Sequence, residues 1–238
     1  MRWIACLALI ALASCVDVVE TGQTPRPAPQ PAAAQRPAEP VVTRAKVEQF
    51  HAVVRRVEPV AERECRARVP RANCDFRIVI DDRPGQPVNA YQTLDRNGQP
   101  ILAFTLPMIG AVRNADELAF VMGHEAAHHI AGHIPRQQQS AAVGALVLGG
   151  IAAVTGAGQG TVDQAVQLGA GVGGRVFSKE FELEADALGT AIAHKAGFDP
   201  MRGVAFFSQI PDPGNRFLGT HPPNAQRVET VRRVASQL

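Results

Sequence analysis

Two histidines four residues apart, with a glutamate directly after the first, constrain this chain more than any other feature. They are His124, Glu125 and His128, in the run His-Glu-Ala-Ala-His. On a helix, positions i and i+4 share a face, so both imidazoles can bind one metal ion. Zinc accepts neutral imidazole nitrogens, and its catalytic sites keep one position open for water. The pattern therefore predicts a helix, a pair of zinc ligands, and Glu125 as the base that takes a proton from that water.

A second motif supplies the third ligand that such a site needs. Glu182 and Asp186 stand four apart in Glu-Leu-Glu-Ala-Asp, so a helix would place them on one face. Glu182 can complete a His₂Glu set for one Zn²⁺ per chain. Asp186 can accept the far N–H of a ligand histidine and fix its tautomer. A solvated acidic face is the alternative, and we assign that role to the neighbouring Glu180 and Glu184.

Two further histidines lie close to the first motif. His129 and His133 are also four apart, but no glutamate follows His129. We therefore reject them as the metal pair. We expect His133 to lie at the surface or behind a ligand, with a direct role as the less favoured alternative.

The order of expected elements indicates an α+β fold. We expect a mainly helical domain with a small antiparallel or mixed β-sheet beside the helix of the first motif. Asn97-Gly98 is a hairpin turn signal, and Asn114 with Glu117 resembles a capping box. Apolar periodicity and turn residues predict a helix over 44–69, strands over 77–81, 88–94 and 101–106, a helix from Asn114 through His133 to Pro135, a helix over 179–196, and a C-terminal helix.

The first 43 residues are expected to be a leader and a tether. Residues 1–14 have a basic start and a short apolar run, as in a signal peptide, and Cys15 closes a lipobox-like sequence. An ordinary secretory signal is the alternative. Residues 15–43 then form a lipidated cysteine and a Pro/Ala-rich tether, because six prolines within 25–40 exclude a helix. Residues 44–238 form the folded domain. The formal charge of +2 does not support binding of nucleic acid.

The remaining cysteines fit export to an oxidising compartment. Cys65 and Cys74 are left over when Cys6 departs with the leader and Cys15 takes lipid. A disulfide between them is the expected state, and two buried thiols are the alternative.

The two motifs together resemble the HtpX/BepA/LoiP family of gluzincin peptidases, over about residues 85–230. Asn89 and Ala90 resemble the strand that precedes the family's motif helix. His221, followed by two prolines, and Arg227 resemble its downstream element. The resemblance implies that Asn89 and Ala90 bind substrate, that His221 approaches the zinc and holds the enzyme latent, and that Arg227 stabilises the transition state. The alternative for His221 and Arg227 is an ordinary surface position without a role in the site.

The implied function is zinc-dependent endopeptidase activity in the bacterial cell envelope. Its expected substrates are unfolded or misassembled polypeptides. The expected location is the periplasmic face of a membrane, anchored through Cys15, with the outer membrane favoured because Val16 follows the cysteine. One alternative is a chaperone-like lipoprotein that binds outer-membrane clients and has a His-blocked zinc site. A zinc ion that only stabilises the fold is a less favoured alternative, because structural zinc sites are closed and usually rich in cysteine. The oligomeric state is not indicated.

The segment between the motifs has an unusual composition. Residues 140–162 carry no charged side chain and are rich in Ala, Gly and Val. We expect a buried helix followed by a mobile, Gly-rich lid, with a transmembrane helix as the alternative. Residues 169–174 are expected to form a flexible hinge.

Overall fold

The computed structural model describes residues 42–176, 178–212, 214 and 221–238. The expected leader at 1–14, the lipidation site Cys15 and almost all of the tether lie outside the described residues, so all three stay predictions.

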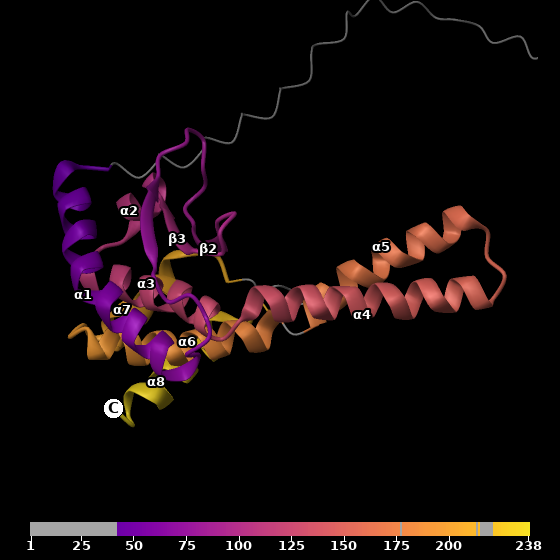
Figure 1. Cartoon of the computed structure of the whole chain (residues 1–238). Helices are drawn as coiled ribbons and strands as arrows, with labels where there is room; N and C mark the ends of the chain where they lie inside the picture. The colour runs from indigo at the N-terminus through magenta and orange to yellow at the C-terminus, as the bar shows by residue number, and fades with distance from the viewer. Residues whose placement is uncertain (1–41, 177, 213, 215–220) are drawn as a thin grey trace, which may run out of the picture. The chain divides into compact units, whose positions relative to one another are not determined.

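The described residues form a mainly α-helical domain with one small sheet (Figure 1). In chain order the elements are α1 (Arg44–Arg68), β1 (Arg77–Asp81), β2 (Ala90–Leu94), β3 (Pro100–Thr105), α2 (Leu106–Ala111), α3 (Ala115–Ile130), α4 (His133–Val154), α5 (Gln159–Val176), α6 (Ser178–Lys195), α7 (Pro200–Gly203), the 3₁₀ helix η1 (Val204–Gln209) and α8 (Asn224–Ala235). The expected α+β class is confirmed.

The sheet is mixed, with strand order β1-β3-β2. β3 pairs with β1 in parallel and with β2 in antiparallel orientation. The turn between β2 and β3 holds Gly98 at φ +78°, a conformation that glycine adopts without strain. β2 is therefore an edge strand of this sheet, and it lies against α3.

Helix α3 is the central element of the domain, and it packs against α1, α6, β2 and β3. The side chain of Asn114 caps its first turn by accepting from the backbone N–H of Glu117 at 3.0 Å. The helix ends at Ile130, because Gly132 adopts the left-handed conformation at φ +66°. α4 begins at His133, so the prediction of one continuous helix to Pro135 is wrong.

The hydrophobic core lies between α1, the sheet and α3. α1 presents one apolar face to it, which includes Phe50, Val53 and Val57, all at most 1% exposed. Phe50 meets Phe104 of β3 edge-to-face, with ring centroids 5.4 Å apart. Phe120 of α3 is buried in the same cluster. This core holds the motif helix against the sheet edge.

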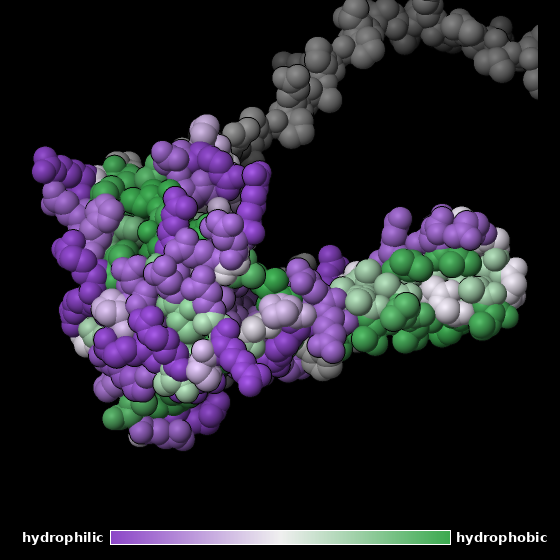
Figure 2. Space-filling view, viewed as in Figure 1, coloured by the Kyte–Doolittle hydropathy of each residue, from purple (hydrophilic) through white to green (hydrophobic). Residues whose placement is uncertain are grey.

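Helices α4 and α5 form an antiparallel hairpin, which Figures 1 and 2 show extending away from the sheet and α3. α4 is helical from His133 to Val154, and most of its large apolar side chains are exposed. The expectation of a buried helix with a lid over 140–162 is therefore wrong. The expected hinge at 169–174 is helical as well, and its Gly169 and Gly173 pack directly on α4.

No helix among the described residues combines the length and the apolar character that a membrane crossing requires.

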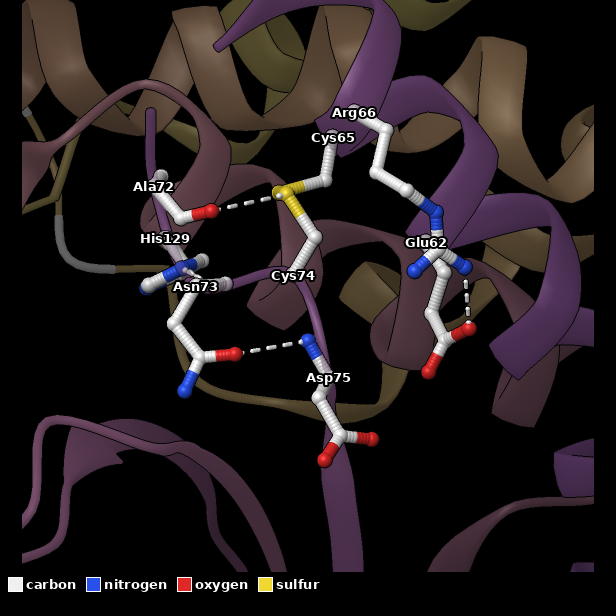
Figure 3. Close-up of a disulfide and its surroundings, with 8 residues drawn as sticks. All are labelled: Glu62, Cys65, Arg66, Ala72, Asn73, Cys74, Asp75 and His129. Atoms are coloured by element: carbon white, nitrogen blue, oxygen red, sulfur yellow. Dashed lines mark hydrogen bonds and ion pairs between the residues drawn. A yellow bond between two sulfur atoms is a disulfide. The ribbon is translucent and has the colours of Figure 1, made fainter. Parts of the chain in front are cut away.

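A disulfide joins Cys65, in the last turn of α1, to Cys74, as Figure 3 shows. The imidazole Nε2 of His129 lies 2.7 Å from the carbonyl oxygen of Asn73 and connects this loop to α3. In the loop-entropy model, a closure over a sequence separation of 9 stabilises the fold by about 2–3 kcal/mol.

Candidate active site

The two motif helices touch at a pair of glycines. A Cβ atom at Gly123 of α3 would lie 2.7 Å from the carbonyl oxygen of Gly189 on α6. A Cβ atom at Gly189 would lie 2.7 Å from the backbone nitrogen of His124. Only hydrogen atoms fit at both positions. This close approach of the two backbones brings the first motif to the second, and the spacing of the motif residues gave no sign of either glycine's role.

Gly189→Ala is expected to push α6 away from α3, because the new methyl group meets main-chain atoms of His124 that cannot yield. We expect a loss of stability of about 1–3 kcal/mol, together with weaker metal binding. Urea unfolding and a competition assay with a chelator measure the two effects. Gly171→Ala is the matched control: it lies on α5 with nothing within 4 Å of its Cβ position, so it should leave stability unchanged or raise it. Equal behaviour of the two variants would disprove the packing argument.

Three ligand atoms converge where the helices meet. The Nε2 atoms of His124 and His128 are 3.0 Å apart, and the Glu182 carboxylate oxygens lie 3.5 Å from each. Among the described residues, these three form the His/Cys/Asp/Glu group whose ligand atoms could hold one metal ion. The structure therefore brings together the ligand set proposed from the sequence.

Asp186 determines the tautomer of His124. Its carboxylate oxygen lies 3.0 Å from His124 Nδ1, and the residue is completely buried. Arg227 of α8 donates to both oxygens of the same carboxylate, from Nε at 2.8 Å and from a terminal nitrogen at 2.6 Å. Burial opposes the ionised form, but Arg227 and His124 hold the pKa of Asp186 below its usual range. A carboxylate only accepts, so His124 Nδ1 carries the proton and its Nε2 presents a lone pair to the site.

His133 and Glu184 perform the same task for His128. His133 is buried at the start of α4, and its Nδ1 lies 2.8 Å from His128 Nδ1. Its Nε2 lies 3.2 Å from Glu184, which also accepts from Arg136 at 2.7 Å. Since Glu184 accepts, His133 is protonated on Nε2 and accepts at Nδ1. His128 therefore donates from Nδ1 and presents Nε2 to the site.

These contacts add a role that the motif spacing did not indicate. Glu184 is exposed, as expected for the acidic face, and it also bridges His133 and Arg136. Only the break at Gly132 turns His133 back towards His128, so the spacing of a continuous helix could not have shown the contact. Position 133 is the histidine expected to lie behind a ligand or at the surface, and the structure places it behind His128.

His133→Phe is expected to weaken zinc affinity by about 10- to 100-fold, because a buried Nδ1–H on His128 loses its acceptor. The phenyl ring can keep the stacking on Phe181, which lies 4.5 Å from the imidazole. His133→Gln restores an acceptor and should recover most of the affinity. Competition with a chromophoric chelator measures all three proteins. If the Phe variant binds zinc like the unaltered chain, His133 does not position His128.

The donor set fits a cation. Two imidazole lone pairs and a carboxylate converge within 4.8 Å. Burial and the neighbouring His124 lower the pKa of His128 to about 3, so this imidazole is neutral. The pKa of Glu182 lies below its usual range although burial opposes this, because His221 and the other two ligands favour the carboxylate. Two imidazole nitrogens with one carboxylate are a ligand set that catalytic zinc takes.

Glu125 lies in the same cleft, which has a volume of about 530 Å³. It is buried, and burial raises its pKa to about 7. The backbone N–H of Gln92 on β2 is directed towards its carboxylate. A buried carboxylate beside an open metal position can exchange a proton with a bound water.

The edge strand β2 borders the cleft. The residues Val88 to Gln92 line it on this side. Asn89 pairs with Thr105 through its carbonyl, and Tyr91 faces Ala103 in the register. Successive backbone groups alternate in direction along an antiparallel strand, so those of Ala90 and Gln92 point away from β3. Asn89 thus holds the strand to the sheet, and Ala90 offers its backbone to the cleft.

The two downstream residues also line the cleft. His221 places Nδ1 3.0 Å from a Glu182 oxygen, and about half of its side chain is exposed. Arg227 is buried, with its guanidinium 3.8 Å from the Phe207 ring centroid and 3.5 Å from Glu182. His221 therefore contacts a ligand, and Arg227 connects that ligand to Asp186.

Comparison with known sequences agrees with this geometry. Residues 47–235 match Peptidase family M48. The chain belongs to peptidase family M48. The match runs from the first turn of α1 to the end of α8, so the ligand cluster and the cleft both lie inside the M48 domain. The expected resemblance is confirmed, and the chain is a metallopeptidase by family.

Three curated relatives of the chain are larger proteins. The chain is 30% identical over 147 residues to the β-barrel assembly-enhancing protease of Escherichia coli strain K12 and to that of Shigella flexneri. The corresponding protein of Escherichia coli O157:H7 is 29% identical. Each alignment covers 52% of this chain and 28% of the relative. The chain therefore matches little more than a quarter of the length of these relatives.

Proposed function

We propose that this protein is a zinc-dependent endopeptidase, with His124, His128 and Glu182 as ligands and Glu125 as general base. One observation carries the proposal. Three hydrogen-bond acceptors converge beside a buried carboxylate, and the hydrogen-bond partners of both histidines direct their lone pairs inward. This arrangement leaves a position for water, as catalytic zinc sites require.

Each residue of the site has a separate proposed role in peptide-bond hydrolysis. Zinc, when bound at the three ligands, would lower the pKa of a coordinated water to about 7 and polarise the scissile carbonyl. Glu125 takes the proton of the attacking water and passes it to the leaving amine. Asp186 and His133 hold the ligand histidines in one tautomer. Arg227 and His221, which line the cleft, are the proposed groups for stabilising the oxyanion.

The proposed substrate is an extended polypeptide. The open edge of β2 faces the cleft, and a substrate segment can pair by main-chain hydrogen bonds with the backbone of Ala90 and with the carbonyl of Gln92. Main-chain pairing needs an extended segment and little sequence, so it favours unfolded or misassembled proteins. Because the relatives are named as proteases that enhance β-barrel assembly, we extend the proposal to envelope quality control. The proposed location is the periplasmic face of the outer membrane, with Cys15 as the lipid anchor.

Removal of the metal is expected to abolish hydrolysis of reduced, unfolded casein. Treatment with 1,10-phenanthroline should stop the reaction, and stoichiometric Zn²⁺ should restore it, because no residue of the site replaces the polarising ion. Metal analysis should find one zinc per chain. A folded substrate, such as a disulfide-bonded globular protein, should resist cleavage. Persistent cleavage by the metal-free protein would disprove the proposed function.

A second candidate is supported by the contact of His221 with Glu182. The 3.0 Å separation places an imidazole against a proposed ligand, at the open side of the site. A latent enzyme that binds outer-membrane clients, with hydrolysis held back by His221, fits this contact. His221→Ala distinguishes the two candidates. A marked rise in casein hydrolysis supports latency, whereas a fall supports a role for His221 in the reaction.

A further inference from the structure

The α4–α5 hairpin carries most of the exposed large apolar side chains of the domain. Eight of the twelve such side chains among the described residues belong to it: Val143, Leu146, Val147, Ile151, Val154, Val166, Leu168 and Val176. Leu146 and Val154 are 76% and 86% exposed. Soluble domains rarely expose contiguous apolar patches of this kind unless a partner covers them.

Five of these residues form a single stripe along α4, which we call the α4 apolar face: Val143, Leu146, Val147, Ile151 and Val154. Their spacing of three and four residues places them on one side of the helix. A groove between the helices, lined by Val143, Val147, Val172 and Val176, continues this face towards α5. In Figure 2 the apolar colour runs along the α4 edge of the hairpin and extends over part of its α5 side.

The interior of the hairpin is built from small residues. A Cβ atom at Gly144 would lie 2.1 Å from the carbonyl oxygen of Gly169, and one at Gly173 would lie 2.2 Å from that of Ser140. The helices are therefore in backbone contact at these positions. Val166 packs on Gly149, but most of the larger apolar side chains of α4 stay exposed. A hairpin that folds in water buries its large side chains, whereas small residues between helices and large ones outside are typical of contact with lipid.

The remaining side of the hairpin is polar. Gln159, Asp163, Gln164 and Gln167 are exposed on α5, and Gln159 donates to Asp163 at 2.8 Å. Figure 2 shows this polar cluster near the tip, across from the apolar edge. Insertion of the tip would carry the charge of Asp163 into hydrocarbon, which is costly. Binding with the long axis parallel to the surface leaves Asp163 in water.

We propose that the α4 apolar face binds a lipid bilayer, lying in the plane of the interface between headgroups and acyl chains. The absence of charge over residues 140–162 favours lipid over a protein partner of matched charge. The proposed lipid anchor at Cys15 would hold the chain at a bilayer. This part of the argument rests on the location given in the proposed function. A tether over 15–43 reaches up to about 90 Å at roughly 3.1 Å per residue. The length of α4 is about 33 Å. The anchor therefore leaves the face free to reach the same bilayer.

Vesicle binding tests the proposal independently of peptidase activity. The chain from residue 15 onward, carrying Cys15→Ser so that no lipid is attached, is mixed with vesicles of phosphatidylethanolamine and phosphatidylglycerol and sedimented. We expect binding by this protein and a loss of about tenfold or more in the Leu146→Glu/Val154→Glu variant. Gln164→Glu/Gln167→Glu adds the same charge to the polar side of α5 and should bind within about twofold of the parent.

A fluorescent reporter gives a second, direct readout. Trp3 is the single tryptophan of the chain and lies in the expected leader, so the tested protein contains none. Leu146→Trp should shift its emission to shorter wavelength on addition of vesicles and be quenched by brominated acyl chains. Gln167→Trp, on the polar side, should do neither. The reporter variants add no charge and leave the face apolar, so they remain informative even where the charged variant is poorly folded.

Three results would overturn the proposal. They are a parent protein that does not sediment with vesicles, a polar-side control that loses binding as strongly as the α4 variant, and equal emission shifts at positions 146 and 167. Concentration-dependent dimerisation without lipid, abolished by Leu146→Glu/Val154→Glu, would instead assign the face to a second copy of the chain. If the parent protein binds vesicles but does not hydrolyse casein, the result contradicts the proposed function and leaves the proposed lipid binding in place.

Discussion

Glu125→Gln should lower the rate of casein hydrolysis by about 10²- to 10⁴-fold while one zinc per chain is retained. The amide has nearly the same shape as the carboxylate but cannot take a proton from water at neutral pH. The three proposed ligands are untouched, so metal content should not change. Steady-state hydrolysis and metal analysis of the same preparation measure both expectations.

Glu180→Gln is the matched control for this substitution. Glu180 lies in the first turn of α6, is exposed, and is not part of the cleft lining. The control should hydrolyse casein at the rate of the unaltered chain. Full activity of Glu125→Gln would remove Glu125 as the base. Loss of zinc in this variant would mean that Glu125 supports the site rather than the proton transfer.

Asp186→Ala should lower the free energy of unfolding by about 3–5 kcal/mol. Asp186 is completely buried, and its removal leaves the buried guanidinium of Arg227 without the carboxylate that receives two of its N–H groups. His124 loses the acceptor that directs its Nε2 to the metal, so zinc affinity should also fall by about 10- to 100-fold. Urea unfolding of the metal-free protein and chelator competition separate the two effects.

Asp163→Ala provides the comparison, because Asp163 is an exposed aspartate on α5 that bonds only to Gln159 in the described structure. It should change stability by less than about 0.5 kcal/mol. The double variant Asp186→Ala/Arg227→Leu should recover part of the stability by removing the unpaired charge. A single Asp186→Ala variant as stable as the Asp163 control would show that the buried pair contributes nothing to the fold.

Local patterns in the sequence were sufficient for the ligand set. The spacing of His124 and His128 specifies two imidazoles on one helical face, and the spacing of Glu182 and Asp186 does the same on a second helix. The cap at Asn114, the turn at Gly98 and the strands were predicted for the same reason: each depends on residues close together in the chain.

Errors arose where a glycine had two possible roles. Gly132 ends α3 by adopting a left-handed conformation, although apolar periodicity continues past it. The glycines of 169–174 were expected to give a hinge, yet Gly169 and Gly173 allow two helices to touch. A missing side chain can permit bending or close packing, and the choice depends on what lies opposite.

Residue types and spacing alone determined which side chains are available for the metal. They also determined which segments of the chain form the helices that carry these side chains. The tertiary structure decided how the ligands are held: Gly189 against His124, Arg227 on Asp186, and His133 behind His128. It also decided that the uncharged α4 presents its large side chains outward. These contacts join residues far apart in the chain or on either side of a helix break, and their free energy depends on packing that no local pattern encodes.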